Sequence, residues 1–220
     1  IVSTKGAQRW AAGHPWIFRS DVVELPSSPP GAVTVLDTRR KPLGIALWSP
    51  RSEISLRLLD VDPDAVIDRE WWHDRIARAL SRRDPLRAHA NAFRLVHAEG
   101  DAAPSLVCDR YDRWLVMQLL SAGIEHYRDD IVATLTELTR ADGILARNDP
   151  PVRAREGLAR ETTLLHGAVP RACTTARGAG GDARHAGHHA ADLSQGARGE
   201  GRPPPWPSLR LDPGALLLRV

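Results

Sequence analysis

The apolar pattern of this 220-residue chain breaks off near Pro170, and this break limits what the chain can fold into. Residues 171–202 are dominated by Arg, Ala, Gly, His and Asp, and three prolines follow them at 203–205. Such a composition buries too little apolar surface to offset the entropy of ordering the chain. We therefore expect an irregular tail over residues 169–220, with no packed core in residues 171–207, and a fold built from the residues before it.

The first part of the chain predicts β-structure. Residues 32–38, 43–49 and 53–60 are rich in apolar and β-branched side chains, and Ile54, Leu56 and Leu58 alternate with polar neighbours. A loop rich in Pro, Ser and Gly precedes the first of these runs, at residues 26–31. Short strands at this spacing favour a small barrel or meander over residues 1–65.

A helix is predicted over residues 68–83, inside a helical connector that spans residues 66–90. Asp68 is suited to cap its first turn, and Pro85 ends the pattern. Trp72, Ile76 and Leu80 are spaced four apart, which puts them in one apolar stripe. We expect this stripe to pack on a core.

A second unit is predicted over residues 91–168, with the order strand, strand, helix, strand, strand. Two of the strands, 106–111 and 114–120, form a hairpin around Asp112-Arg113, and the helix covers 125–140. Gly143 is suited to a left-handed cap after that helix. Together with the N-terminal β-unit, this pattern predicts the α+β fold class. The remaining strands are a lead-in at 93–98 and two later ones at 144–147 and 162–165.

Composition and charge exclude several classes of protein. No stretch of about 18 apolar residues is present, so no membrane helix is expected, and the N-terminus does not read as a secretory signal, so a cytoplasmic location is expected. Cys108 and Cys173 are predicted to be free thiols, with Cys108 buried in a strand. His185 and His189 have the spacing of helical metal ligands, but their Gly- and Ala-rich surroundings argue against a metal site. The net charge of +3 decides nothing alone.

Three sequence strings together resemble one family. They are KGAQRWAAGHPWIFRSDV (residues 5–22), GIALWSPRSEISLRLL (44–59) and RLVHAEGDAAPSLVCDRYDRWLVMQLLSAGIE (94–125), and RNDPPVRAREGL (147–158) follows them. They resemble the bacterial, S-adenosylmethionine-dependent methyltransferases that modify 23S ribosomal RNA at the 5-carbon of cytosine. The resemblance implies an N-terminal PUA domain followed by the family's middle domain.

Two departures from this family are visible. The family's middle-domain loop Asp-Gly-Leu-Pro-Gly is replaced by residues 101–105, DAAPS, which we expect to relax a turn. The doubly wound catalytic domain needs a Gly-rich turn after a strand and an acidic residue for the cofactor ribose. The Gly-rich residues 178–181 follow no apolar strand, and no acidic residue stands in the expected place after one. Cys173 lies in no catalytic motif, so we expect no cofactor site and no catalytic residue in this chain. A shifted reading frame or an internal deletion would account for the tail.

The candidate RNA-binding residues surround the string Gly13-His14-Pro15-Trp16. Trp16 is suited either to stack on a base or to fill the barrel core, whereas Phe18 is assigned to the core. Positive charge beside an aromatic ring suits RNA, because phosphate neutralisation supplies much of the affinity. Glu99 and Asp101 sit at a strand end, where a role in the turn is expected. The full set of RNA candidates is Lys5, Arg9, His14, Trp16, Arg19, Arg51 and Ser52.

Three functions compete at this point. The first is the RNA-binding portion of a ribosomal RNA methyltransferase with catalysis absent from this chain. The second is a working methyltransferase with an unrecognised core, and the third is a free-standing PUA adaptor that binds RNA or a protein partner. Neither DNA nor a membrane is expected as a partner. Saturable binding of S-adenosylmethionine would favour the second function, and salt-sensitive RNA binding without cofactor would favour the first or third.

Overall fold

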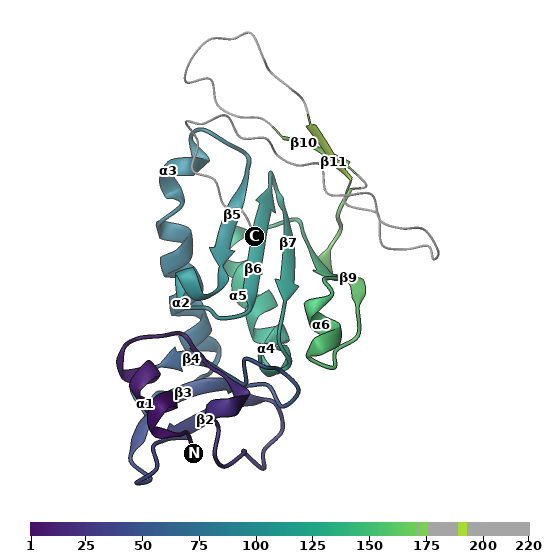
Figure 1. The fold of residues 1–220 in the computed structure, drawn as a ribbon. Coiled ribbons are helices and arrows are strands. Elements are labelled where there is room, and N and C mark those ends of the chain that lie inside the picture. Colours follow the sequence, from purple (N-terminus) through teal and green to yellow (C-terminus); the bar gives the residue numbers. More distant parts are fainter. Residues whose placement is uncertain (171, 176–188, 193–220) are drawn as a thin grey trace, which may run out of the picture.

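A computed structural model describes residues 1–170, 172–175 and 189–192 of the chain (Figure 1). The fold is organised around a four-stranded and a five-stranded sheet, and helices α2 and α5 pack against one another. The N-terminal unit contains α1 (Thr4–Ala11), β1 (Trp16–Ile17), η1 (Arg19–Asp21), β2 (Gly31–Leu36), β3 (Pro42–Trp48) and β4 (Leu56–Asp60). The connector contains α2 (Arg69–Ser81) and α3 (Asp84–Arg87). The α+β unit contains β5 (Ala92–His97), η2 (Ala98–Asp101), β6 (Leu106–Tyr111), β7 (Trp114–Leu119), α4 (Ala122–Glu125), α5 (Arg128–Thr139), β8 (Gly143–Asn148), α6 (Val152–Arg155) and β9 (Glu161–Gly167).

The N-terminal unit is a four-stranded antiparallel sheet in the order β1-β4-β3-β2. The three strands predicted in this region are therefore confirmed. The predicted barrel is not closed by strand pairing, because β1 and β2 lie at opposite edges of this sheet. Close to the N-terminus, Val2 donates a hydrogen bond to the Leu36 carbonyl and forms an isolated bridge with Val22.

Helix α1 was not predicted from the sequence, which indicated only β-structure in this region. The Ser3 hydroxyl accepts a hydrogen bond from the Gly6 N–H and so caps the first turn. Trp10 is buried in the core of the unit, and its indole donates a 2.7 Å hydrogen bond to the Leu43 carbonyl. The helix ends at Ala11, and Gly13 follows with a φ of +73°, a conformation that favours glycine. Burial of Trp10 thus anchors α1 on the core of the N-terminal unit.

The connecting helix matches its prediction. Asp68 caps α2 by accepting a hydrogen bond from the Trp71 N–H at 2.9 Å, and Trp72, Ile76 and Leu80 are all buried. Beyond the predicted stop, Pro85 lies in the first turn of the short helix α3 instead of ending all helical structure.

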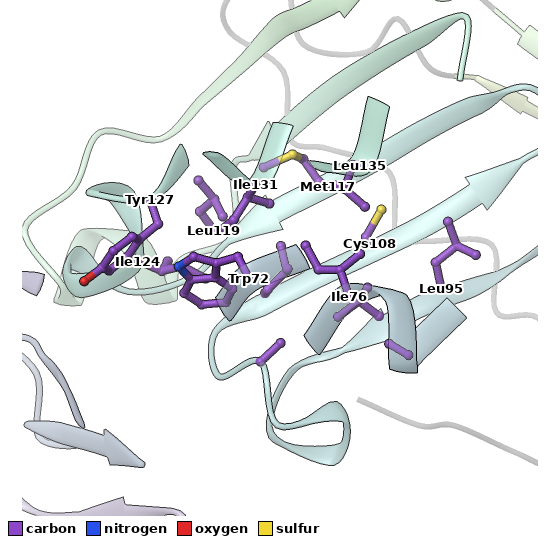
Figure 2. Packing of buried hydrophobic residues seen from close by; sticks show 14 of the residues in the cluster. Trp72, Ile76, Leu95, Cys108, Met117, Leu119, Ile124, Tyr127, Ile131 and Leu135 are labelled. Carbon is purple, nitrogen blue, oxygen red and sulfur yellow. The ribbon is translucent and has the colours of Figure 1, made fainter. Parts of the chain in front are cut away.

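The α+β unit is built on a mixed sheet with the order β5-β6-β7-β8-β9. Only β7 and β8 run parallel, and the other neighbours are antiparallel, so the predicted α+β class is confirmed. One face of this sheet forms the main core with α2 and α5 (Figure 2). In that core Trp72 and Ile76 of α2 lie near Ile131 and Leu135 of α5. Cys108 is fully buried in β6, as predicted.

The helix expected over residues 125–140 is confirmed by α5, and the short helix α4 precedes it. The prediction of its cap was wrong. The left-handed residue after α5 is Arg140, with φ of +50°, and not Gly143. Gly143 instead begins β8, where a Cβ atom would lie 2.2 Å from the Ala168 carbonyl oxygen. Glycine is needed there for close backbone approach, not for helix capping.

The tail contains one element that its composition did not predict. Residues Ala172–Thr175 (β10) and His189–Asp192 (β11) form an antiparallel two-stranded pair, which differs from the expected irregular structure. The expectation of no packed core in residues 171–207 otherwise falls on residues outside those that the structure describes.

Candidate RNA interface

A cluster of rings and a guanidinium lies where α1 leads into β1. His14, Trp16 and Phe18 form this aromatic cluster, with the His14 ring centroid 6.1 Å from that of Trp16 and 6.5 Å from that of Phe18. The Nδ1 atom of His14 accepts a hydrogen bond from the Trp16 N–H at 3.1 Å, which fixes the ring against the backbone. Arg9 places its guanidinium 4.9 Å from the centre of the Phe18 ring.

The assignment of Phe18 to the core was wrong. Phe18 is only half-buried and packs under Arg9, whereas its neighbour Ile17 is the buried residue of this strand. Successive side chains of a strand point to opposite faces, so burying Ile17 turns both Trp16 and Phe18 away from the core. In residues 16–18 every side chain is aromatic or apolar, so alternation alone does not indicate which face is buried.

Trp16 joins the two units of the molecule. It is half-buried, and its indole donates a 2.9 Å hydrogen bond to a Glu99 carboxylate oxygen in η2. This contact, between residues 83 positions apart, was invisible to reasoning from local pattern. Trp16 is not one of the buried residues of the N-terminal core, and its stacking on a base stays a prediction.

The predicted basic residues of this region differ in how freely they can meet a ligand. Lys5 is fully on the surface of α1. Arg9 is half-buried and pairs with the buried carboxylate of Asp21 at 2.5 Å. Arg19 is exposed, and its guanidinium donates to the Pro50 carbonyl. Lys5 and Arg19 are therefore the more available cations, while Arg9 also has a structural partner.

Arg51 and Ser52 occupy opposite environments although they are adjacent. Arg51 is exposed and lies against Gly157 of the α+β unit, where a Cβ atom would come within 2.6 Å of its Cδ. Ser52 is buried, and its hydroxyl lies 3.4 Å from the Arg57 guanidinium that donates to it. The burial of Ser52 fits a role inside the protein better than one on an RNA surface.

A buried polar seam holds the N-terminal unit against the α+β unit. Arg57 of β4 pairs with Glu156 at 2.9 Å, and both side chains are buried. The second oxygen of Glu156 accepts a hydrogen bond from the Ala122 N–H, and the Ser49 hydroxyl accepts one from the Gly123 N–H. A Cβ atom on Gly123 would lie 2.8 Å from the Trp48 carbonyl oxygen, so glycine permits this close contact. The two units therefore meet through specific polar pairs beside an apolar contact, in which Ile45, Leu47 and Leu59 belong to the same core as Ile124 and Tyr127.

Glu99 and Asp101 have structural partners, as expected for residues in a turn. Asp101 is buried, accepts a 2.6 Å hydrogen bond from the His97 N–H and pairs with Arg83 at 2.7 Å. It ties η2 to the end of α2. The carboxylate of Glu99 accepts the hydrogen bond from the Trp16 indole.

The residues that the structure describes do not fit S-adenosylmethionine. In an open sheet with parallel strands, cofactors bind beyond the carboxyl ends of those strands. Beyond β7 and β8 this space is filled by Arg153, which is buried and donates to the Leu119 carbonyl and to Glu125. Glu156 and its partner Arg57 fill the adjoining space. No step of methyl transfer is therefore assigned to these residues.

Cys108 is equally unsuited to catalysis. It is fully buried in β6, and burial, assisted by the carboxylate of Asp109, raises the pKa of its thiol well above the usual range. A thiol held in this neutral form is a poor nucleophile. The side chain of Cys173 lies outside the described part of the structure.

Metal sites and membrane-spanning helices are both absent from the described residues. In residues 1–170 and the two short strands that follow, no group of three or more His, Cys, Asp or Glu side chains is placed to hold a metal ion. Within the same residues, no helix is long and apolar enough to cross a bilayer. The histidines at 185 and 188 lie outside the described residues.

Comparison with known proteins identifies the relatives of the chain. Residues 1–60 match the PUA-like domain family PUA_3. The chain is 39% identical over 161 residues to the ribosomal RNA large subunit methyltransferase I of Tolumonas auensis, covering 71% of this chain and 41% of that protein. The corresponding protein of Shewanella amazonensis is 38% identical with the same coverage. The chain thus spans about two fifths of the length of these relatives.

Solved structures confirm the fold. A protein described as a candidate SAM-dependent methyltransferase from Streptococcus mutans superposes with a TM-score of 0.67 at 16% identity, over 79% of this chain and 44% of the other. A second structure, of a candidate methyltransferase complexed with SAH, also gives 0.67, at 17% identity. At this identity the likeness concerns the fold alone. Through its sequence, the chain is a partial-length homologue of the ribosomal RNA large subunit methyltransferase I family, and its residues 1–60 are a PUA-like domain.

Proposed function

We propose that this chain is the RNA-recognising portion of a methyltransferase that uses S-adenosylmethionine to methylate a cytosine of large-subunit ribosomal RNA. The observation that carries the proposal is the 39% identity to ribosomal RNA large subunit methyltransferase I, together with the PUA-like match at residues 1–60. In this proposal the described residues bind RNA, and methyl transfer is not performed by them.

The surface around the aromatic cluster supports RNA as the ligand. Lys5 and Arg19 are exposed cations that flank the cluster in sequence, and Arg9 adds a third cation with its guanidinium over Phe18. Cations of this kind neutralise phosphates, while His14 and the exposed part of Trp16 offer ring faces and edges to unpaired bases. Ser52 is left out of the proposed surface because it is buried.

Titration of a fluorescently labelled fragment of 23S ribosomal RNA with the whole chain, at a series of salt concentrations, tests this proposal. We expect binding that weakens steeply with salt, because each neutralised phosphate releases counterions. The double variant Lys5→Glu/Arg19→Glu should weaken binding and reduce the salt slope by about two. Arg78→Glu, at an exposed position on α2, serves as the matched charge-reversal control.

Two outcomes would contradict the proposal. If the unaltered chain shows no salt-sensitive binding to the RNA fragment, the chain is not an RNA-recognising portion. If equilibrium dialysis shows saturable binding of S-adenosylmethionine, the chain itself holds a cofactor site, and the assignment of RNA binding alone is wrong. RNA binding with no preference for ribosomal over unrelated RNA would instead favour a free-standing adaptor.

A further inference from the structure

We infer that the RNA-binding surface crosses from the PUA-like domain onto the α+β unit, along a row of exposed arginines above the buried Arg57–Glu156 pair. This row consists of Arg19, Arg51 and Arg155, and we call it the seam arginines. The inference rests on the proposed function and extends it, because it assigns part of the RNA contact to a second unit with no PUA-like match.

The first link of the row joins Arg19 to the loop after β3. Arg19 donates its guanidinium to the carbonyl of Pro50, which directly precedes Arg51. Its backbone N–H is bonded to the Glu53 carbonyl at 2.8 Å, so η1 is fastened to the same loop. These contacts keep the Arg19 charge next to Arg51.

The second link crosses between the two units. Arg51 lies on Gly157, and a Cβ atom at that position would come 2.9 Å from one of its guanidinium nitrogens. Gly157 has a φ of +77° and follows α6. Arg155, exposed in the last turn of α6, is two residues before Gly157. Two residues span at most about 7 Å of chain, so Arg155 lies within side-chain reach of the Arg51 guanidinium.

The seam arginines lack ion-pair partners among the described residues. Arg51 and Arg155 make no ion pair in the part of the chain that the structure describes. Glu156, the acidic residue that follows Arg155, is buried and already paired with Arg57. Glu53 is the exposed acid of the same loop. Exposed guanidinium groups in a row, with their counterions in solvent, are suited to phosphate groups of a polynucleotide.

The seam also fixes the spacing of the row. The Arg57 guanidinium donates hydrogen bonds to the Ser49 hydroxyl and the Ile54 carbonyl, and the Glu156 carboxylate accepts one from the Ala122 N–H. Arg155 is next to Glu156, and Arg51 is next to Ser52, whose hydroxyl accepts from Arg57, so these contacts fix the backbone of both exposed arginines across the boundary. A backbone that is already ordered reduces the entropy cost of binding to that of the arginine side chains.

Charge reversal at Arg155 tests the inference, since this residue lies outside the PUA-like domain. We expect Arg155→Glu, and separately Arg51→Glu, to weaken binding of the labelled 23S fragment several-fold and to reduce the salt slope by about one each. The double variant should reduce it by about two. Arg155→Lys retains the charge and should bind nearly as the unaltered chain does. Arg78→Glu controls for net charge, and thermal melting followed by circular dichroism checks the fold of each variant.

The outcomes separate this inference from the proposed function. If Lys5→Glu/Arg19→Glu weakens RNA binding but Arg155→Glu and Arg51→Glu bind with unchanged affinity and salt slope, the seam inference is overturned and the proposed function stands. If Arg155→Glu has no greater effect than Arg78→Glu, the effect is one of net charge and the inference is again overturned. If the unaltered chain binds no RNA, both are overturned.

Discussion

The guanidinium of Arg57 and the carboxylate of Glu156 lie 2.9 Å apart at the boundary between the two units, and both are buried. Removing one member of a buried pair leaves the other charge without compensation, which costs more than the pair contributes when intact. The free energy of unfolding should therefore depend on whether a substitution removes one member of this pair or both.

We predict that Glu156→Leu lowers the free energy of unfolding by about 3–5 kcal/mol, measured by urea denaturation. The double variant Arg57→Met/Glu156→Leu should recover much of this loss, because no buried charge is then left unpaired. Glu24→Ala, which removes the exposed partner of Arg40, should cost less than about 1 kcal/mol. A double variant as unstable as the single one would show that the boundary depends on the pair itself.

The loop at residues 101–105 supports a second prediction. Ala102 and Ser105 have φ values of +54° and +68°, the left-handed region in which residues other than glycine are strained. These are the two positions at which the family's Asp-Gly-Leu-Pro-Gly loop has glycine. The expectation that the substitutions relax the turn was therefore wrong, because the backbone keeps the conformation that glycine favours.

Ala102→Gly and Ser105→Gly should each stabilise the chain by about 1 kcal/mol, because glycine adopts a positive φ without the steric cost. Urea denaturation of the single variants measures this. Ala103→Gly is the control in the same loop, since Ala103 is buried and is not among the residues with positive φ. That substitution should destabilise, and stabilisation of all three variants alike would argue against strain as the cause.

The pH dependence of stability should include a contribution from Asp60. Burial raises the pKa of Asp60, but hydrogen bonds from the Trp71 indole, the Asp62 N–H and the Arg75 guanidinium outweigh it and hold the pKa below its ordinary value of 3.8. A lowered folded-state pKa stabilises the protein above 3.8, and this stabilisation is lost as the pH falls through the folded-state value. Asp60→Asn should remove that part of the acid dependence, measured by urea denaturation at several pH values. An unchanged acid profile would exclude Asp60 as a contributor.

The buried thiol of Cys108 gives a prediction about reactivity. Burial raises its pKa, so the reactive thiolate is scarce and the sulfur is shielded from reagents. In a Cys173→Ser background, iodoacetamide should not label the native chain and should label it once urea has unfolded it. Mass spectrometry distinguishes the two states. Rapid labelling under native conditions would contradict the buried position of Cys108.

Local patterns in the sequence were sufficient for much of the fold. The Asp68 cap and the Trp72 stripe predicted α2, and the alternation in β6 and β7 predicted their hairpin, because each signal depends on residues close in the chain. Helix α1 was missed although its local signals, the Ser3 cap and an amphipathic pattern with Trp10 on the buried face, lie in the sequence. The contacts of Trp16 with Glu99 and of Arg51 with Gly157 join distant segments, so only tertiary structure reveals them.

Trp16 donates a hydrogen bond to Glu99 and, in the proposed RNA surface, also presents its ring to a base. Trp16→Phe removes the indole N–H but keeps an aromatic ring, so it should cost about 1 kcal/mol of stability and leave RNA affinity nearly unchanged. Trp16→Ala should cost stability as well and weaken RNA binding by about 1–3 kcal/mol if the ring stacks on a base. A double-mutant cycle with Glu99→Ala measures the stability term by urea denaturation. If Trp16→Ala and Trp16→Phe bind the 23S fragment equally well, the ring makes no contact with RNA and Trp16 serves only to join the two units.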